Sequence, residues 1–110
     1  MERKLRTPYI QVALDFPDWK LQTKILDKLP KSDKFILEAG TPLLKRYGID
    51  IISKIKKYFP ENLILADLKT LDVGEIEIDF SFKAGADMAV CSGLANPLSI
   101  DKFLKAAHDN

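Results

Sequence analysis

The chain has 110 residues, of which 46% are hydrophobic and 30% are charged, and its formal net charge is +1. This length allows one domain with a modest hydrophobic core. The near-neutral charge gives no support for a nucleic-acid partner or an acidic membrane surface, and no apolar run is long enough to cross a bilayer. The single cysteine, Cys91, excludes an intrachain disulfide and suits a reducing compartment, so we expect a cytoplasmic protein.

Short apolar runs alternate along the chain with segments of helical periodicity. After a polar lead-in at residues 1–8, the runs recur roughly every 25 residues and predict four buried strands. These strands are Tyr9–Leu14, Phe35–Ala39, Leu63–Leu68 and Met88–Cys91. Strands that alternate with helices predict a parallel sheet with right-handed crossovers.

Proline and glycine mark the ends of the predicted helices. The first helix carries apolar residues spaced by four and stops at Pro30. The second has Thr41 as its N-cap and Pro42 at its first position, and it runs through Gly48 to Pro60. The third ends at Gly85, and the fourth starts near Ser99 and runs to the end of the chain. The apolar stripes are Leu21, Ile25 and Leu29; Leu44, Tyr47, Ile51, Ile55 and Tyr58; Val73, Ile76, Phe80 and Ala84; and Ile100, Phe103, Leu104 and Ala107.

Charged residues fall at the carboxyl ends of the first three strands, where parallel sheets bind their ligands. They are Asp15, Glu38, Asp67, Lys69 and Asp72. Three successive strands that each bring a carboxylate to one edge are hard to explain by packing, because like charges repel. A bound divalent cation, a lysine, or both would relieve the repulsion, and oxygen ligands without a Cys or His cluster favour Mg²⁺. The structural alternative is a strand-end salt bridge with an N-capping aspartate.

Three segments at these strand ends resemble a known family. They read QVALD at 11–15, LEAGTPL at 37–43 and ADLKTLDVG at 66–74. They are similar to the orotidine monophosphate decarboxylase superfamily of (βα)8 barrels, and most similar to 3-hexulose-6-phosphate synthase, including the archaeal form fused behind a formaldehyde-activating domain. The resemblance implies an α/β fold in which residues 1–110 form one domain, the N-terminal (βα)4 half of a TIM barrel.

The resemblance also implies a role for each charged residue. Glu38 and Asp67 match the acids that hold Mg²⁺, and Asp15 matches the residue that contacts sugar-phosphate hydroxyls. Lys69 matches the lysine that binds the enediolate oxygens, and Asp72 matches an aspartate that reaches the partner subunit's site in family dimers; with Asp67 they form the catalytic set. The implied reaction is reversible aldol addition of formaldehyde to D-ribulose 5-phosphate. A metal and an ammonium suit this reaction because both stabilise the charge of an enediolate.

Other members of the superfamily are kept as alternatives. Orotidine monophosphate decarboxylases carry a lysine near the end of the second strand, so Glu38 favours the metal-dependent branch. The other member of that branch, 3-keto-L-gulonate-6-phosphate decarboxylase, shares the Glu-x-Gly-Thr segment. Here Pro42 and the segment 91–95 look more like the synthase.

A complete barrel of this kind needs about 250 residues, so the resemblance leaves out the half with the family's phosphate-binding loops and general base. His108, the only histidine, is expected to be an exposed helix end. The open strand edges predict a homodimer or a complementing second half barrel, with sugar phosphate and formaldehyde as small-molecule partners. A noncatalytic assembly module is the alternative.

Overall fold

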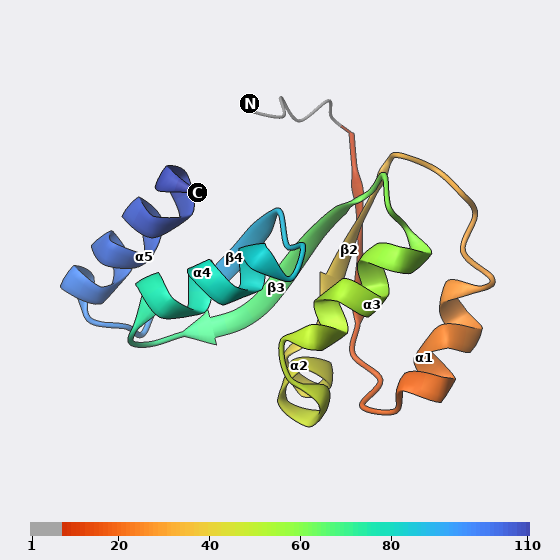
Figure 1. Cartoon of the computed structure of the whole chain (residues 1–110), viewed down its shortest axis with the longest axis horizontal. Coiled ribbons are helices and arrows are strands. Elements are labelled where there is room, and N and C mark those ends of the chain that lie inside the picture. Colours follow the sequence, from red (N-terminus) through yellow and green to blue (C-terminus); the bar gives the residue numbers. More distant parts are fainter. Residues whose placement is uncertain (1–7) are drawn as a thin grey trace.

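The computed structural model describes residues 8–110 and shows a four-stranded parallel sheet in the order β1-β2-β3-β4 (Figure 1). One helix or a pair of helices follows each strand, which confirms the predicted succession of four βα units. The strands are β1 Ile10–Leu14, β2 Phe35–Ala39, β3 Leu63–Thr70 and β4 Met88–Cys91. The helices are α1 Trp19–Leu26, α2 Thr41–Tyr47, α3 Asp50–Tyr58, α4 Gly74–Lys83 and α5 Pro97–Asp109. The predicted lead-in lies outside the described residues, apart from Pro8.

The third strand is longer than predicted and contains an irregularity. Its register with β4 pairs Ala66 with Ala89 and then Thr70 with Cys91, so that four steps along β3 match two along β4. Such a bulge bends a strand and re-aims the side chains around it. It therefore falls on the part of β3 that carries the predicted site residues.

The second predicted helix is in fact two helices. Gly48 has a φ of 75° and its N–H donates to the Leu44 main-chain oxygen at 2.7 Å, which ends α2. A new helix, α3, begins at Asp50. Glycine adopts this left-handed conformation without steric cost. Gly48, which was predicted only to weaken one continuous helix, therefore separates two helices.

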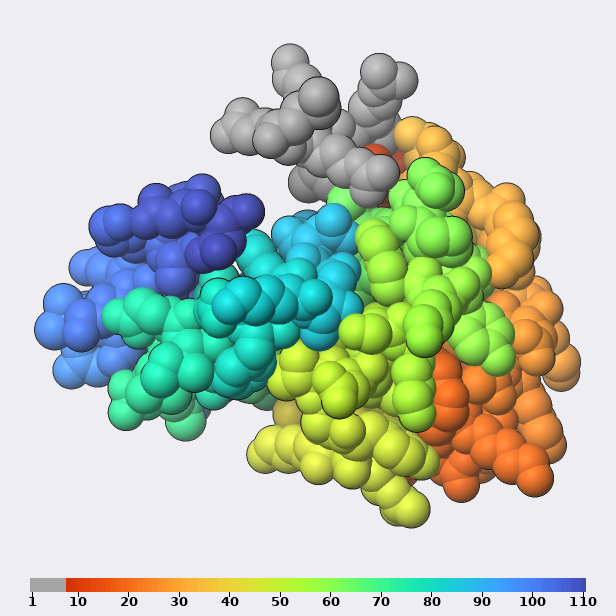
Figure 2. Space-filling view, in the orientation of Figure 1, coloured from red at the N-terminus to blue at the C-terminus, as the bar shows by residue number. Residues whose placement is uncertain are grey.

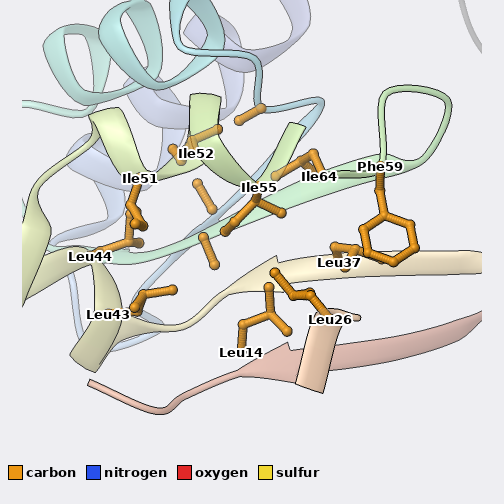
Figure 3. Packing of buried hydrophobic residues seen from close by; sticks show 13 residues of the cluster. Leu14, Leu26, Leu37, Leu43, Leu44, Ile51, Ile52, Ile55, Phe59 and Ile64 are labelled. Carbon is orange, nitrogen blue, oxygen red and sulfur yellow. The ribbon is translucent and has the colours of Figure 1, made fainter. Parts of the chain in front are cut away.

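The core lies between the sheet and helices α1, α2 and α3 (Figure 3). Side chains from the helix-facing side of β1, β2 and β3 meet the inner faces of these helices. The largest buried members are Leu14, Leu26, Leu37, Leu43, Ile51, Ile52, Ile55, Phe59 and Ile64. This packing fixes the relative positions of the first three strand ends.

Two predicted helix faces differ from the observed ones. Helix α1 ends at Leu26 and buries Gln22 and Leu26. Of its predicted stripe, Leu21 is exposed, whereas Ile25 is half-buried and Leu29 packs against the core. Helix α4 begins at Gly74, after Val73, and buries Gly74, Ile78 and Ser81. Its predicted stripe is exposed at Val73, Ile76 and Phe80.

Helix α5 packs on α4 at Gly74. A Cβ on Gly74 would lie 2.9 Å from the Phe103 Cβ, so the two helices approach more closely there than a side chain allows. Helix α5 starts at Pro97, earlier than predicted, because the Asn96 side chain accepts the Leu98 N–H and caps it. Figure 2 shows this blue segment beside α4 and apart from α1.

The opposite face of the sheet carries a row of aligned residues at the level of Glu38. The register places Ala13 beside Glu38, Glu38 beside Leu65, and Leu65 beside Met88. These side chains are exposed or half-buried, whereas Ile36 and Leu63 in the neighbouring row are buried, so the described elements cover this face only in part. Within residues 8–110, β1 and β4 each pair with one strand only and form open edges, as predicted. No helix in this range has the length and apolar character to span a membrane.

Candidate active site

The site centres on an ion pair at the end of β3. Lys69 Nζ donates a hydrogen bond to Asp67 Oδ2. The Asp67 side chain is 11% exposed, whereas the Lys69 side chain is 60% exposed. The other carboxylate oxygen, Asp67 Oδ1, is buried and has no hydrogen-bond partner among residues 8–110. A buried acceptor without a donor is costly, so Asp67 Oδ1 is suited to accept a ligand from outside the chain.

The backbone at Lys69 adopts an unusual conformation. Its φ is 47°, in the left-handed region that residues with a side chain rarely enter. Lys69 lies inside the bulge of β3 between Ala66 and Thr70. Regular alternation predicts Asp67 and Lys69 on one face, and the two side chains do meet, although the strand between them is irregular.

Thr41 joins the end of β2 to this pair. Its hydroxyl oxygen accepts a hydrogen bond from Lys69 Nζ at 3.0 Å and donates one to the Asp67 main-chain oxygen at 2.8 Å. The N-cap of α2 is Gly40, and no side chain caps this helix, so the predicted capping role of Thr41 is wrong. The sequence feature that could have indicated its role is its position two residues after the end of β2, close to Glu38.

Glu38 and Asp15 complete the cluster. Glu38 Oε2 accepts a hydrogen bond from Gln11 Nε2, so Gln11 belongs to the site although sequence reasoning gave it no role. The pKa of Lys69 is raised, first by its hydrogen bond to Asp67. Partial desolvation acts in the opposite direction, and the negative charges of Asp67, Glu38 and Asp15 raise the pKa further. The three predicted carboxylates at the strand ends thus all act on Lys69.

Asp72 lies outside this cluster. It is exposed, and its Oδ1 accepts the Val73 N–H at 2.8 Å. With Asn96 and Lys102 it lines a separate cleft of about 470 Å³ between the start of α4 and the start of α5. Its predicted role in a partner subunit's site stays a prediction. His108 is exposed in the last turn of α5, as expected.

The donor set is compatible with Mg²⁺. Among residues 8–110, no three His, Cys, Asp or Glu side chains gather closely enough to hold a metal ion on their own. Mg²⁺, however, keeps several waters and is often bound by only one or two protein carboxylates together with its substrate. Glu38 and the unpartnered Asp67 Oδ1 offer ligands of that kind.

Comparison with known proteins shows which family the chain is similar to. The model of the orotidine 5'-phosphate decarboxylase / HUMPS family matches residues 8–110. A protein named bifunctional enzyme Fae/Hps from Methanococcoides burtonii is 52% identical over 101 residues, which are 92% of this chain and 26% of that protein. A protein of the same name from Methanocella arvoryzae is 48% identical over 100 residues, which are 91% of this chain and 25% of that protein. The chain thus spans about a quarter of these relatives.

Solved structures show the same fold. The 3-hexulose-6-phosphate synthase from Salmonella typhimurium superposes with a TM-score of 0.82 at 36% identity, over 90% of this chain and 46% of that one. The 3-keto-L-gulonate-6-phosphate decarboxylase from Vibrio cholerae gives 0.81 at 28% identity, over 94% and 48%. The described residues therefore form about half of the TIM barrel of these proteins, as predicted. The chain belongs to the orotidine 5'-phosphate decarboxylase / HUMPS family.

Proposed function

We propose that the chain supplies the enediolate-binding half of a Mg²⁺-dependent aldolase, a lyase of the 3-hexulose-6-phosphate synthase type. The reaction joins formaldehyde to D-ribulose 5-phosphate to give D-arabino-hex-3-ulose 6-phosphate, or cleaves that compound in the reverse direction. The observation that carries the proposal is the Lys69–Asp67 pair at the strand ends. In this pair the buried Asp67 Oδ1 accepts no hydrogen bond from the described residues and can bind a ligand. Relatives named Fae/Hps at 52% and 48% identity support this choice of reaction.

Lys69 suits the stabilisation of negative charge. Transfer of a proton from the carbon beside the ketone to a base outside the described residues leaves an enediolate, with one negative charge on the former carbonyl oxygen next to a hydroxyl oxygen. The Lys69 ammonium is protonated at neutral pH, since its pKa is raised above 10.5, and it can donate hydrogen bonds to those oxygens. Asp67 Oδ2 holds the ammonium in place, and Mg²⁺ bound by Glu38 and Asp67 would add further positive charge at the same oxygens.

Substrate binding needs more than the described half. Asp15 stands exposed after β1 and is proposed to contact the sugar hydroxyls. The chain covers 46% of the Salmonella synthase, so contacts to the substrate phosphate are proposed to come from a second half barrel. A homodimer or a complementing partner chain would provide it.

A second candidate is the decarboxylation of 3-keto-L-gulonate 6-phosphate. A protein named for it superposes as well as the Salmonella synthase does, and an enediolate also suits that reaction. The identity of 36% to the Salmonella synthase and of 39% to another solved 3-hexulose-6-phosphate synthase, against 28% to that decarboxylase, favours the aldolase. A noncatalytic half barrel is the third possibility, which the experiment below also addresses.

The test is formaldehyde release from hexulose 6-phosphate by the purified chain, with and without Mg²⁺. Asp67→Ala is expected to abolish both the release and the binding of Mg²⁺ measured by calorimetry. Asp109→Ala is the matched control, because Asp109 also pairs with a lysine but on the exposed end of α5. Unchanged Mg²⁺ affinity in Asp67→Ala would contradict the ligand assignment. Faster carbon dioxide release from 3-keto-L-gulonate 6-phosphate would favour the decarboxylase, and no turnover of either substrate would favour a fragment that needs its other half.

A further inference from the structure

The Thr41 hydroxyl bridges two strand ends. Thr41 begins α2, directly after β2, whereas Lys69 and Asp67 belong to β3. The hydroxyl lies 3.0 Å from Lys69 Nζ and 2.8 Å from the Asp67 main-chain oxygen. Thr41 is half-buried, and the branching of threonine at Cβ limits its χ1 torsion, so the two hydrogen bonds can hold the hydroxyl in one position.

The two hydrogen bonds of Thr41 have fixed directions. A hydroxyl carries one proton, and the main-chain oxygen of Asp67 can only accept it. The Thr41 oxygen is therefore left as an acceptor, which the Lys69 ammonium satisfies. An ammonium has three N–H donors. Asp67 Oδ2 and Thr41 accept two of them, so within the described part of the chain one N–H remains for a ligand.

Lys69 needs this second anchor. Its side chain is 60% exposed, and one ion pair alone restricts a long, flexible lysine side chain only weakly, even though Asp67 is buried. We propose that Thr41 is a positioning residue: its hydroxyl fixes the Lys69 ammonium at a second point and so aims the remaining N–H at the ligand. The identity of that ligand as an enediolate oxygen rests on the proposed function, whereas the anchoring does not.

The test measures the mobility of the Lys69 ammonium in the chain without substrate. The protein is prepared with isotope-labelled lysine, the Lys69 signal is assigned from Lys69→Arg, and the order parameter of the Nζ group is measured by NMR relaxation. Thr41→Val removes the hydroxyl and keeps the shape of the side chain. The order parameter is expected to fall from the range of rigid groups to below about 0.6. Thr41→Ser, which keeps the hydroxyl, is expected to retain most of the order.

Thr23→Val is the matched control. Thr23 also donates its hydroxyl to a main-chain oxygen, that of Lys20 at 2.9 Å, but it lies in α1. This variant should leave the Lys69 signal unchanged. If Thr41→Val does not fold, Thr41→Ala provides the same loss of hydroxyl in a smaller side chain.

Two results would overturn the proposal. One is a wild-type order parameter in a folded variant that lacks the Thr41 hydroxyl. The other is a Thr41→Ser variant as mobile as Thr41→Val, which would show that the methyl group and not the hydroxyl matters. Formaldehyde release is measured separately, so a failure of the aldolase proposal would not be mistaken for a failure of this one.

Discussion

The Asp15 carboxylate lies directly against Gly40. A Cβ built on Gly40 would stand 2.0 Å from Asp15 Oδ1 and 2.7 Å from the Leu14 main-chain oxygen. Gly40 has an ordinary φ of −66°, so the site requires glycine for space and not for backbone freedom. The Gly40 N–H also donates to the Leu14 oxygen at 3.1 Å, which ties the end of β2 to the end of β1.

Gly40→Ala is expected to destabilise the chain. The Asp15 side chain can rotate away, but the Leu14 oxygen belongs to the backbone, so the two strand ends must move apart. Overpacking of this kind costs about 1–3 kcal/mol, measured by urea unfolding. Gly93→Ala is the control, because a Cβ there has no neighbour within 4 Å. Equal stability of the two variants would contradict the close contact.

Glu77→Ala is also expected to lower the stability. Thr70 is buried at the end of β3, and its hydroxyl donates to Glu77 Oε2 on α4. Removal of the carboxylate leaves a buried hydroxyl without an acceptor, which costs about 1–3 kcal/mol; Glu77→Gln keeps an acceptor and should lose less. Glu75→Ala is the control, since Glu75 shares the first turn of α4 and the same helix dipole. The prediction fails if Glu75→Ala and Glu77→Ala unfold at the same urea concentration.

The sequence was sufficient to predict the strands and the site edge. The strands Phe35–Ala39 and Met88–Cys91 have the predicted bounds. A short apolar run between two helical segments forms a buried strand in a fold of alternating strands and helices, so its length sets the length of the strand. The alternation of strands and helices then placed Asp15, Glu38 and Asp67 at one edge without any knowledge of their contacts. Family resemblance added the roles, which stay proposals.

Features that depend on close packing were not predictable in this way. Periodicity gave the wrong face for α4, because contact between Gly74 and Phe103, and not the apolar stripe, sets how that helix packs. The bulge around Lys69 has no signature in the local sequence. Thr41 and Gln11 were missed as site residues because their roles arise from partners 28 and 27 residues away along the chain.

Val73→Asn is expected to stabilise the chain. Val73 has a φ of 50° at the N-terminus of α4, a conformation that is strained for a β-branched residue and tolerated by asparagine. Val73 is 50% exposed, so the replacement loses little apolar burial. Relief of the strain should contribute about 1 kcal/mol and raise the melting temperature by several degrees. Val73→Ala, which loses the branched side chain and stays strained, should show a smaller effect, and a melting temperature below wild type for Val73→Asn would refute the prediction.

The ion pair at the strand ends should make stability depend on alkaline pH. The pKa of Lys69 is raised above its ordinary value of 10.5, first through the hydrogen bond to Asp67 and, against partial desolvation, also through nearby negative charges. A raised pKa in the folded state means that the pair's contribution is fully present below pH 10.5 and is lost as the pH rises through the folded-state value. Asp67→Asn removes the first cause, so the pKa should return toward 10.5.

An NMR titration of the lysine Cε signals measures this shift. Lys105 is an internal reference in the same sample, because its pKa is raised by its hydrogen bond to Asp109 on α5 and does not depend on Asp67. Asp67→Asn should therefore lower the titration midpoint of Lys69 and leave that of Lys105 in place. A fall in both midpoints would indicate a global change in the fold, and an unchanged Lys69 midpoint would mean that Glu38 and Asp15, and not Asp67, set its charge state.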